Sequence, residues 1–229
     1  MRKSLMKKGL IALTIPLLLH IGCGSAPNGG SFNREALMDP KSEAMNQTAP
    51  DKFKAKFITS EGDFVVEVTR EWAPLGADRF YNLVFNGFYD NVRFFRVIPN
   101  FMAQFGINGD PEITAKWVGH PQLNPNWQDV ALQDDPVNAK NERGTLTFGN
   151  AGPNTRTTQV FINFNHSAHL DGMGFAPFGQ VVEGMEAVDA INPQYRELPN
   201  QGKIMTEGNA YLEANFPEMT YIKTARIID

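Results

Sequence analysis

The sequence predicts a mainly-β domain of the sandwich or barrel class. Short apolar segments with strand alternation recur between residues 51 and 229, and turn-forming Gly, Pro, Asn and Asp separate them. Only two segments in this range have clear helical spacing. Many short strands with few helices are typical of sandwiches and barrels, and a domain of this length has room for one buried core.

The first predicted elements form a β-hairpin. Phe53, Ala55 and Phe57 alternate with lysines, a turn follows at 60–63, and a second strand covers 64–68. Five further strands are predicted, at 92–98, 144–148, 160–164, 178–182 and 221–228.

The two predicted helices cover 77–86 and 184–191. Phe80, Leu83 and Val84 recur at helical spacing in the first, and Gly87 is placed to end it. Residues 107–143 and 192–220 show little periodicity, although 207–216 has the composition of a short helix. Because long structureless loops are uncommon in compact domains, these two segments are either functional or contain unrecognised elements.

The N-terminus has the pattern of an export signal. Four basic residues lie within the first eight positions, and an apolar run follows at 10–21. The run is too short for a transmembrane helix, which needs about 20 residues. We therefore expect residues 1–22 to be a removable signal peptide.

Cys23 is the only cysteine in the chain and directly follows Gly22 at the end of this run. The arrangement resembles a bacterial lipobox, although His20 stands where leucine is usual. The alternative is an ordinary signal peptide that contains a cysteine. The lipobox resemblance implies lipidation of Cys23 and a location in the bacterial cell envelope. Low apolar content and many turn-forming residues predict that residues 23–50 are a flexible tether. A lone cysteine excludes intrachain disulfides.

The charge of the chain argues against nucleic acid as a partner. Loss of the four basic residues of the signal changes the formal net charge from −4 to −8. An acidic chain without basic clusters is poorly suited to nucleic acid or to an anionic lipid surface. We therefore expect membrane attachment through the anchor alone, and a monomeric protein.

Several catalytic motifs are missing from the sequence. It contains no phosphate-binding loop, no paired cysteines and no Gly-x-Ser-x-Gly elbow. His166, His169 and Asp171 could be drawn as a metal site, but they lack the helical spacing of the zinc-protease motif. We expect no metal and no cofactor.

Two segments stand out chemically. In residues 94–104, Arg96 lies in an apolar strand, which is costly unless the guanidinium is paired or faces a site. In residues 148–162, a turn of small residues joins two predicted strands. Its exposed backbone is suited to hydrogen-bonding an extended peptide.

These two segments, which contain three motifs, and three shorter motifs after them resemble the cyclophilin family of peptidyl-prolyl isomerases over roughly residues 53–191. Six motifs occur in the family's order: Phe-Arg-x-Ile-Pro-x-Phe-Met-x-Gln, Asn-Ala-Gly-Pro-Asn-Thr, Gln-x-Phe-Ile, Leu-Asp-Gly, Phe-Gly-x-Val and Gly-Met-x-x-Val. The resemblance implies a closed eight-stranded antiparallel β-barrel capped by two α-helices. It also implies that residues 51–229 catalyse cis/trans isomerisation of X-Pro bonds in proline-containing polypeptides.

The resemblance also assigns the site residues. Arg96, Gln104 and Phe101 are the expected catalytic residues. The expected substrate-binding residues are Met102, Asn150, Gln159, Phe161, His169, Leu170 and Phe175. Periodicity alone favours ordinary core packing for the apolar members of this set, so their assignment depends on the resemblance.

The chemistry of isomerisation suits these residue types. Peptide rotation has a barrier of about 18–20 kcal/mol because the nitrogen lone pair is delocalised into the carbonyl. A guanidinium that donates to the prolyl nitrogen as the bond twists lowers this barrier. A 10⁵-fold acceleration requires only about 7 kcal/mol, and no nucleophile or metal is needed.

The sequence departs from the family pattern near the rim of the expected site. Gly149 replaces the usual Ala, His169 stands where Trp or Phe is frequent, and Phe175 lies where many members carry a His. Two alternative functions are also compatible with the sequence. One is a non-catalytic cyclophilin-fold binding module, and the other is a lipid-anchored barrel that holds a small apolar ligand in an open lumen.

Overall fold

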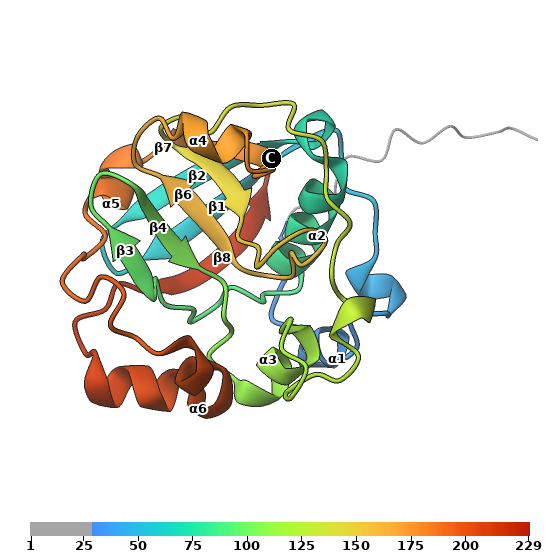
Figure 1. The fold of residues 1–229 in the computed structure, drawn as a ribbon, viewed down its shortest axis with the longest axis vertical. Coiled ribbons are helices and arrows are strands. Elements are labelled where there is room, and N and C mark those ends of the chain that lie inside the picture. The colour runs from blue at the N-terminus through green and yellow to red at the C-terminus, as the bar shows by residue number, and fades with distance from the viewer. Residues whose placement is uncertain (1–28) are drawn as a thin grey trace, which may run out of the picture.

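In the computed structural model, residues 29–229 are described, so the predicted signal peptide and Cys23 lie outside the described residues. The core of the fold is one sheet of eight antiparallel strands in the order β3-β4-β6-β5-β7-β2-β1-β8 (Figure 1). The strands are β1 Lys52–Thr59, β2 Asp63–Thr69, β3 Arg96–Ile98, β4 Met102–Phe105, β5 Thr145–Phe148, β6 Val160–Asn163, β7 Pro177–Glu183 and β8 Ile222–Ile228. The mainly-β prediction is confirmed, although strand β4 had no separate sequence signal.

The expectation of a closed barrel is wrong, because the sheet is an open, curled half-barrel with β3 and β8 at its edges. The backbone of residues 92–94, predicted as strand, pairs with the start of β8 only through an isolated bridge between Arg93 and Tyr221 and two flanking hydrogen bonds. Regular pairing of β3 begins at Arg96, and its partner there is β4. The two edge strands therefore do not form a ladder with each other.

The described residues contain six α-helices, where two were expected. They are α1 Arg34–Met38, α2 Pro74–Phe85, α3 Pro111–Trp117, α4 Ala168–Asp171, α5 Met185–Asp189 and α6 Gln201–Asn215. There are also three short 3₁₀ segments, at Glu43–Met45, Arg70–Trp72 and Trp127–Asp129. Helices α2 and α5 correspond to the two predicted helices, and α6 begins before the segment predicted at 207–216.

Helix α2 is defined at both ends by its sequence. Pro74 occupies the first turn, where its missing N–H costs nothing. At the other end Gly87 adopts a left-handed φ of 73°. The N–H groups of Gly87 and Phe88 donate to the carbonyls of Val84 and Leu83, which is the Schellman arrangement that ends a helix.

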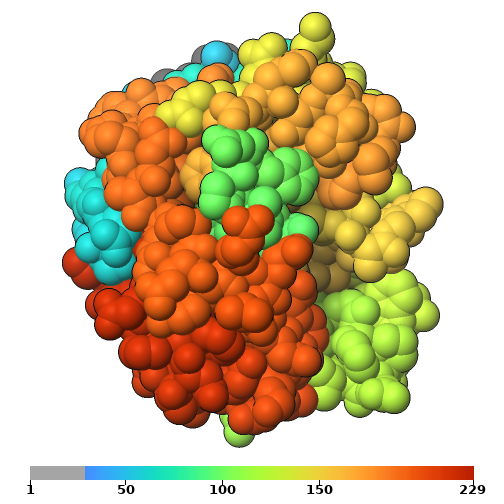
Figure 2. Space-filling model, turned by 60° about the vertical axis from the view of Figure 1, so that its left-hand side comes forward, coloured from blue at the N-terminus to red at the C-terminus, as the bar shows by residue number. Residues whose placement is uncertain are grey.

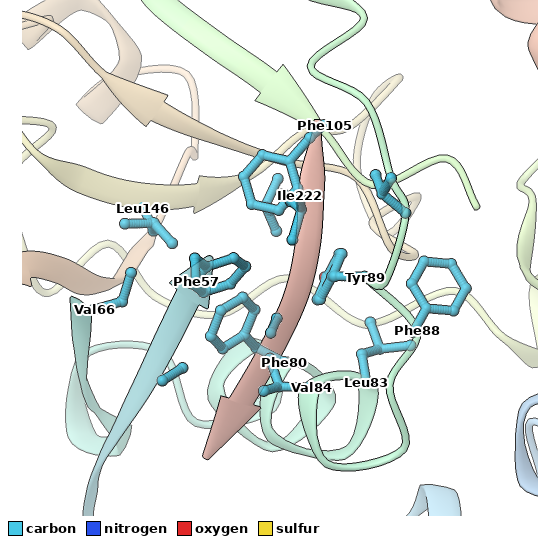
Figure 3. Packing of buried hydrophobic residues seen from close by; sticks show 14 of the residues in the cluster. Phe57, Val66, Phe80, Leu83, Val84, Phe88, Tyr89, Phe105, Leu146 and Ile222 are labelled. Carbon is cyan, nitrogen blue, oxygen red and sulfur yellow. The ribbon is translucent and has the colours of Figure 1, made fainter. Parts of the chain in front are cut away.

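The space enclosed by the curled sheet and α2 is filled by aromatic and aliphatic side chains (Figure 3). Phe57 packs against Phe64, Phe80, Tyr89 and Phe105 with ring centroids 4.8 to 6.4 Å apart. All five rings are at most 1% exposed, and each buried ring of this kind contributes roughly 1.5–3 kcal/mol. A filled interior argues against the alternative of an open lumen for an apolar ligand.

Residues 34–50 differ from the predicted flexible tether, because they pack against the domain. Helix α1 begins at an Asn33 cap, and Leu37 is fully buried in the core. The indole Nε1 of Trp117 donates a 2.8 Å hydrogen bond to the Leu37 carbonyl, while Met45 and Ala49 are also buried. The segment's low apolar content concealed these few well-spaced anchor residues.

The two long segments without predicted periodicity also contain structure, and they meet. Helices α3 and α6 lie side by side (Figure 1). Within α6, Gly208 has a φ of 62°, and a Cβ at this position would lie 2.2 Å from the Gly109 carbonyl oxygen. Glycine thus permits a close approach of α6 to the residues before α3. Beneath α6 lies a second apolar cluster of Phe95, Ile107, Ile204, Leu212 and Met219.

Candidate active site

The candidate site lies on the outer face of the β3-β4-β6 end of the sheet. Arg96, Gln104 and Phe161 are direct partners across these three strands, so their side chains share one face. The neighbouring register row contains Val97, Ala103 and Ile162, which point into the main core. Strand alternation therefore places the polar catalytic candidates outside and their neighbours inside.

A chain of polar contacts links the side chains on this face. Arg96 Nη1 donates to Gln104 Oε1 over 3.4 Å, and Gln104 Nε2 donates to Gln159 Oε1 over 2.8 Å. Arg96 Nε donates to Glu197 Oε1 over 2.6 Å. The Arg96 side chain is 31% exposed and lines the cavity, so the otherwise costly Arg in an apolar strand is both paired and open to the site.

An apolar pocket lies beside this polar chain. Met102, Phe161 and Leu170 form a small buried cluster that is separate from the main core. Its partly buried neighbours are Ile98, Phe101 and Phe175. Phe175 meets Phe161 edge to face, with ring centroids 5.8 Å apart. The apolar character of this pocket suits a proline ring.

One cavity of about 450 Å³ joins the polar chain and the apolar pocket. Nine of the ten predicted site residues line it: Arg96, Phe101, Met102, Gln104, Asn150, Gln159, Phe161, Leu170 and Phe175. The tenth, His169, is exposed on α4 and its ring lies 5.8 Å from that of Phe101, at the rim. The structure thus brings the predicted residues together.

The cavity also has lining residues that the sequence analysis did not assign: Gly119, His120, Gly149, Ala151, Thr155, Thr157, Gln201 and Met205. Ala151 and Thr155 lie within the Asn-Ala-Gly-Pro-Asn-Thr motif, so that motif could have identified them. Gly119, His120, Gln201 and Met205 come from the two long segments without periodicity. On the face shown in Figure 2, the orange-to-red C-terminal segment borders the green segment around β3.

The small-residue turn at 149–155 is fixed from behind by a loop at 133–135. Asp134 and Asn154 exchange hydrogen bonds of 2.8 and 3.0 Å between backbone N–H and side-chain oxygen. Asp135 and Arg156 form a buried ion pair of 2.9 Å. The turn that exposes backbone to the cavity is therefore held by contacts at both Asn154 and Arg156.

Asp171, at the end of α4, is hydrogen-bonded to Asn141 and has a structural role. The carboxylate of Asp171 accepts hydrogen bonds of 2.8 Å from both the backbone and the side chain of Asn141. Desolvation alone would raise the pKa of Asp171, but these hydrogen bonds, together with the charges of His166 and Lys140, outweigh it and lower the pKa below its ordinary value. Among residues 29–229 no group of three or more His, Cys, Asp and Glu side chains is arranged to hold a metal ion.

Comparison with known proteins bears directly on this geometry. Residues 54–207 match the family model described as cyclophilin type peptidyl-prolyl cis-trans isomerase. The chain belongs to the cyclophilin family. The match includes the segments 94–104 and 148–162, which line the cavity. It places the chain among the peptidyl-prolyl isomerases, which are enzymes.

Curated cyclophilins from fungi are similar to most of the domain. The peptidyl-prolyl cis-trans isomerase-like 3 protein of Gibberella zeae is 38% identical over 155 residues, which cover 62% of this chain and 87% of that protein. The isomerase-like 1 protein of Aspergillus fumigatus is 37% identical over 135 residues, which cover 59% of this chain and 79% of that protein. These relatives support the isomerase domain and carry no information on the predicted anchor.

A solved cyclophilin has the same fold. The crystal structure of a cyclophilin type isomerase from Cryptosporidium parvum superposes with a TM-score of 0.55 and 22% sequence identity, covering 78% of this chain and 98% of that one. The mainly-β cyclophilin-like fold is therefore confirmed. Within the described part of this cyclophilin, no helix combines the length and hydropathy required to cross a membrane.

Proposed function

We propose that this cyclophilin isomerises X-Pro bonds of exported proteins outside the cytoplasm, as a monomer held at a membrane by a lipid on Cys23. The isomerase part is supported by one observation above the others. A single cavity is lined by both the guanidinium of Arg96 and the apolar cluster of Met102, Phe161 and Leu170. A charged donor beside an apolar ring pocket is the arrangement that rotation about a prolyl bond requires.

In the proposed mechanism the proline ring enters the apolar cluster beside Phe101. The backbone of Asn150, on the turn held by the loop at 133–135, pairs with the residue before the proline. Arg96 then donates to the prolyl nitrogen as the bond twists and its lone pair localises. Gln104 holds the guanidinium through Nη1. Because this donation strengthens only in the twisted state, it lowers the barrier rather than merely binding the substrate.

Isomerase activity of the mature chain, residues 23–229, is the first test. A proline-containing peptide is followed by NMR exchange or by a protease-coupled assay, with the Arg96→Ala variant as the matched control. We expect clear catalysis by the unaltered chain and a large loss in the variant. Binding of the peptide without catalysis would overturn the enzyme assignment in favour of a binding module.

The export and anchoring part is supported by the basic N-terminus, the short apolar run and the Gly22-Cys23 pair. The full chain and Cys23→Ser are expressed in a bacterial host with a labelled fatty acid. We expect the full chain to take up label and sediment with membranes, and Cys23→Ser to do neither. Equal partition of both proteins into the soluble fraction would refute the anchor and leave the isomerase proposal intact.

A further inference from the structure

Glu197 contacts the proposed catalytic arginine from a segment to which the sequence assigned no role. Its Oε1 accepts from Arg96 Nε over 2.6 Å, and the two residues are 101 positions apart. The carboxylate is 60% exposed, so the pair contributes little to overall stability. Any effect of Glu197 is therefore an effect on the guanidinium itself.

The backbone around Glu197 is fixed by contacts that do not involve the ion pair. The N–H of Val97, next to Arg96, donates to the Arg196 carbonyl over 3.1 Å. Arg196 adopts a left-handed φ of 47°, which is costly for a residue with a side chain and persists only where neighbouring contacts hold it. The chain thus turns sharply just before Glu197.

Both members of the pair are carried on one packed unit. Phe95, directly before Arg96, is buried in the cluster beneath α6 with Ile204 and Leu212. Tyr195, two residues before Glu197, packs edge to face on Phe216 at 5.1 Å and belongs to the same cluster. The distance between the two backbones at the ion pair is therefore set by shared apolar packing.

The two acceptors hold different nitrogens of the same planar group. Glu197 takes Nε and Gln104 takes Nη1 of Arg96. A guanidinium has five N–H donors, and among the described residues Nη2 has no hydrogen-bond partner. Two acceptors at separate nitrogens fix the plane of the guanidinium and leave donors free for the cavity that Arg96 lines.

We propose that Glu197 is a positioning residue for Arg96, which holds the guanidinium in the plane needed for donation to the prolyl nitrogen. This inference rests on the proposed isomerase function. An unrestrained arginine samples many rotamers, so loss of one anchor lowers the fraction of enzyme with a correctly oriented donor. The consequence is a lower kcat with an unchanged KM, because the apolar pocket that binds the proline ring is untouched.

The test compares Glu197→Ala and Glu197→Gln with Glu207→Ala, an exposed glutamate on α6. Steady-state isomerisation gives kcat and KM, and circular dichroism verifies folding. We expect Glu197→Ala to lower kcat about threefold, as an exposed ion pair allows, with KM unchanged. Glu197→Gln keeps an acceptor for Nε and should retain most of the activity, and Glu207→Ala should match the unaltered chain.

A spectroscopic measurement separates positioning from general destabilisation. The Nε–H of Arg96 is followed in arginine side-chain NMR spectra. We expect slow solvent exchange in the unaltered chain and in Glu197→Gln, and faster exchange in Glu197→Ala. A Glu197→Ala variant with equal or higher kcat, or a Glu197→Gln variant no better than Glu197→Ala, would overturn the inference. If Arg96→Ala also remains fully active, the proposed catalytic role of Arg96 fails as well.

Discussion

Arg96 and Gln104 lie directly opposite each other on β3 and β4, and Arg96 Nη1 donates to Gln104 Oε1 over 3.4 Å. Their pairing is a consequence of strand register rather than of a specific strong bond. The orientation of the Arg96 side chain therefore depends on its planar guanidinium group, in which Nη1 donates to Gln104 and Nε donates to Glu197.

The first prediction follows from the planar shape of the Arg96 guanidinium. Arg96→Lys keeps the positive charge but loses the planar group, so it should lose nearly as much kcat/KM as Arg96→Ala. A hydrogen bond from a charged donor supports a loss of about 10- to 100-fold. Peptide affinity should stay within a few fold in both variants. Kinetics beside NMR titration check this, and near-normal activity of Arg96→Lys would show that charge alone suffices.

The apolar pocket predicts a different pattern for Phe101→Ala. Because Phe101 packs against the cluster of Met102, Phe161 and Leu170, its loss should weaken peptide binding as well as turnover. Met173→Ala is the matched control, since Met173 is a large apolar residue with 64% exposure near the same rim. The Kd for a proline peptide measures the effect. An unchanged Kd in Phe101→Ala would remove this ring from the binding site.

His169 predicts weak inhibition by cyclosporin. The resemblance implies that many cyclophilins use an indole donor at this position, and His169 lies beside Phe101 at the rim. His169→Trp restores the indole and should tighten cyclosporin binding. Isothermal titration of both proteins measures it. Tight binding by the unaltered chain would contradict the assignment of His169 to this position.

The carboxylate of Asp135 is predicted to make a large contribution to the free energy of unfolding. Its carboxylate accepts from the backbone N–H of Leu75 and Gly76 at the start of α2 and pairs with buried Arg156. Asp135→Ala removes the buried partner of that arginine, which then keeps only one carboxylate contact, the longer 3.6 Å contact of its Nε with Asp134, and should lower the free energy of unfolding by about 3–5 kcal/mol. Asp129→Ala removes an exposed pair with Lys41 and should cost about 0–1 kcal/mol. Urea denaturation of both variants provides the comparison.

The packed segment before β1 predicts that a chain beginning at residue 51 is less stable than one beginning at 29. Removal of residues 29–50 deletes the buried side chains of Leu37, Met45 and Ala49 and the carbonyl that accepts from the Trp117 indole. Leu37→Ala in the longer chain should cost about 2–5 kcal/mol. Glu35→Ala, an exposed change in the same helix, is the control. Equal Tm values for the two chain lengths would contradict this role.

The sequence by itself determined every strand except β4, the helices α2 and α5, and most of the site. Alternation in β1 and the glycine stop of α2 are local patterns, because each depends on the period or the φ angle of its own residues. The catalytic candidates were identified by ordered motifs, and nine of the ten line one cavity. Only the rim residue His169 lies just outside it.

Only the tertiary structure decided the contacts between segments that are far apart in the chain, because no local sequence pattern specifies them. The contact of Glu197 with Arg96, the burial of Leu37 and the open edge between β3 and β8 each join segments far apart in the chain. A segment such as 192–200 has no periodic face, so its position is set by a few anchors on distant elements, including the Val97 N–H and the ring of Phe216. Periodicity reports which face of an element is buried, whereas the partner it meets there depends on the packing of the whole chain.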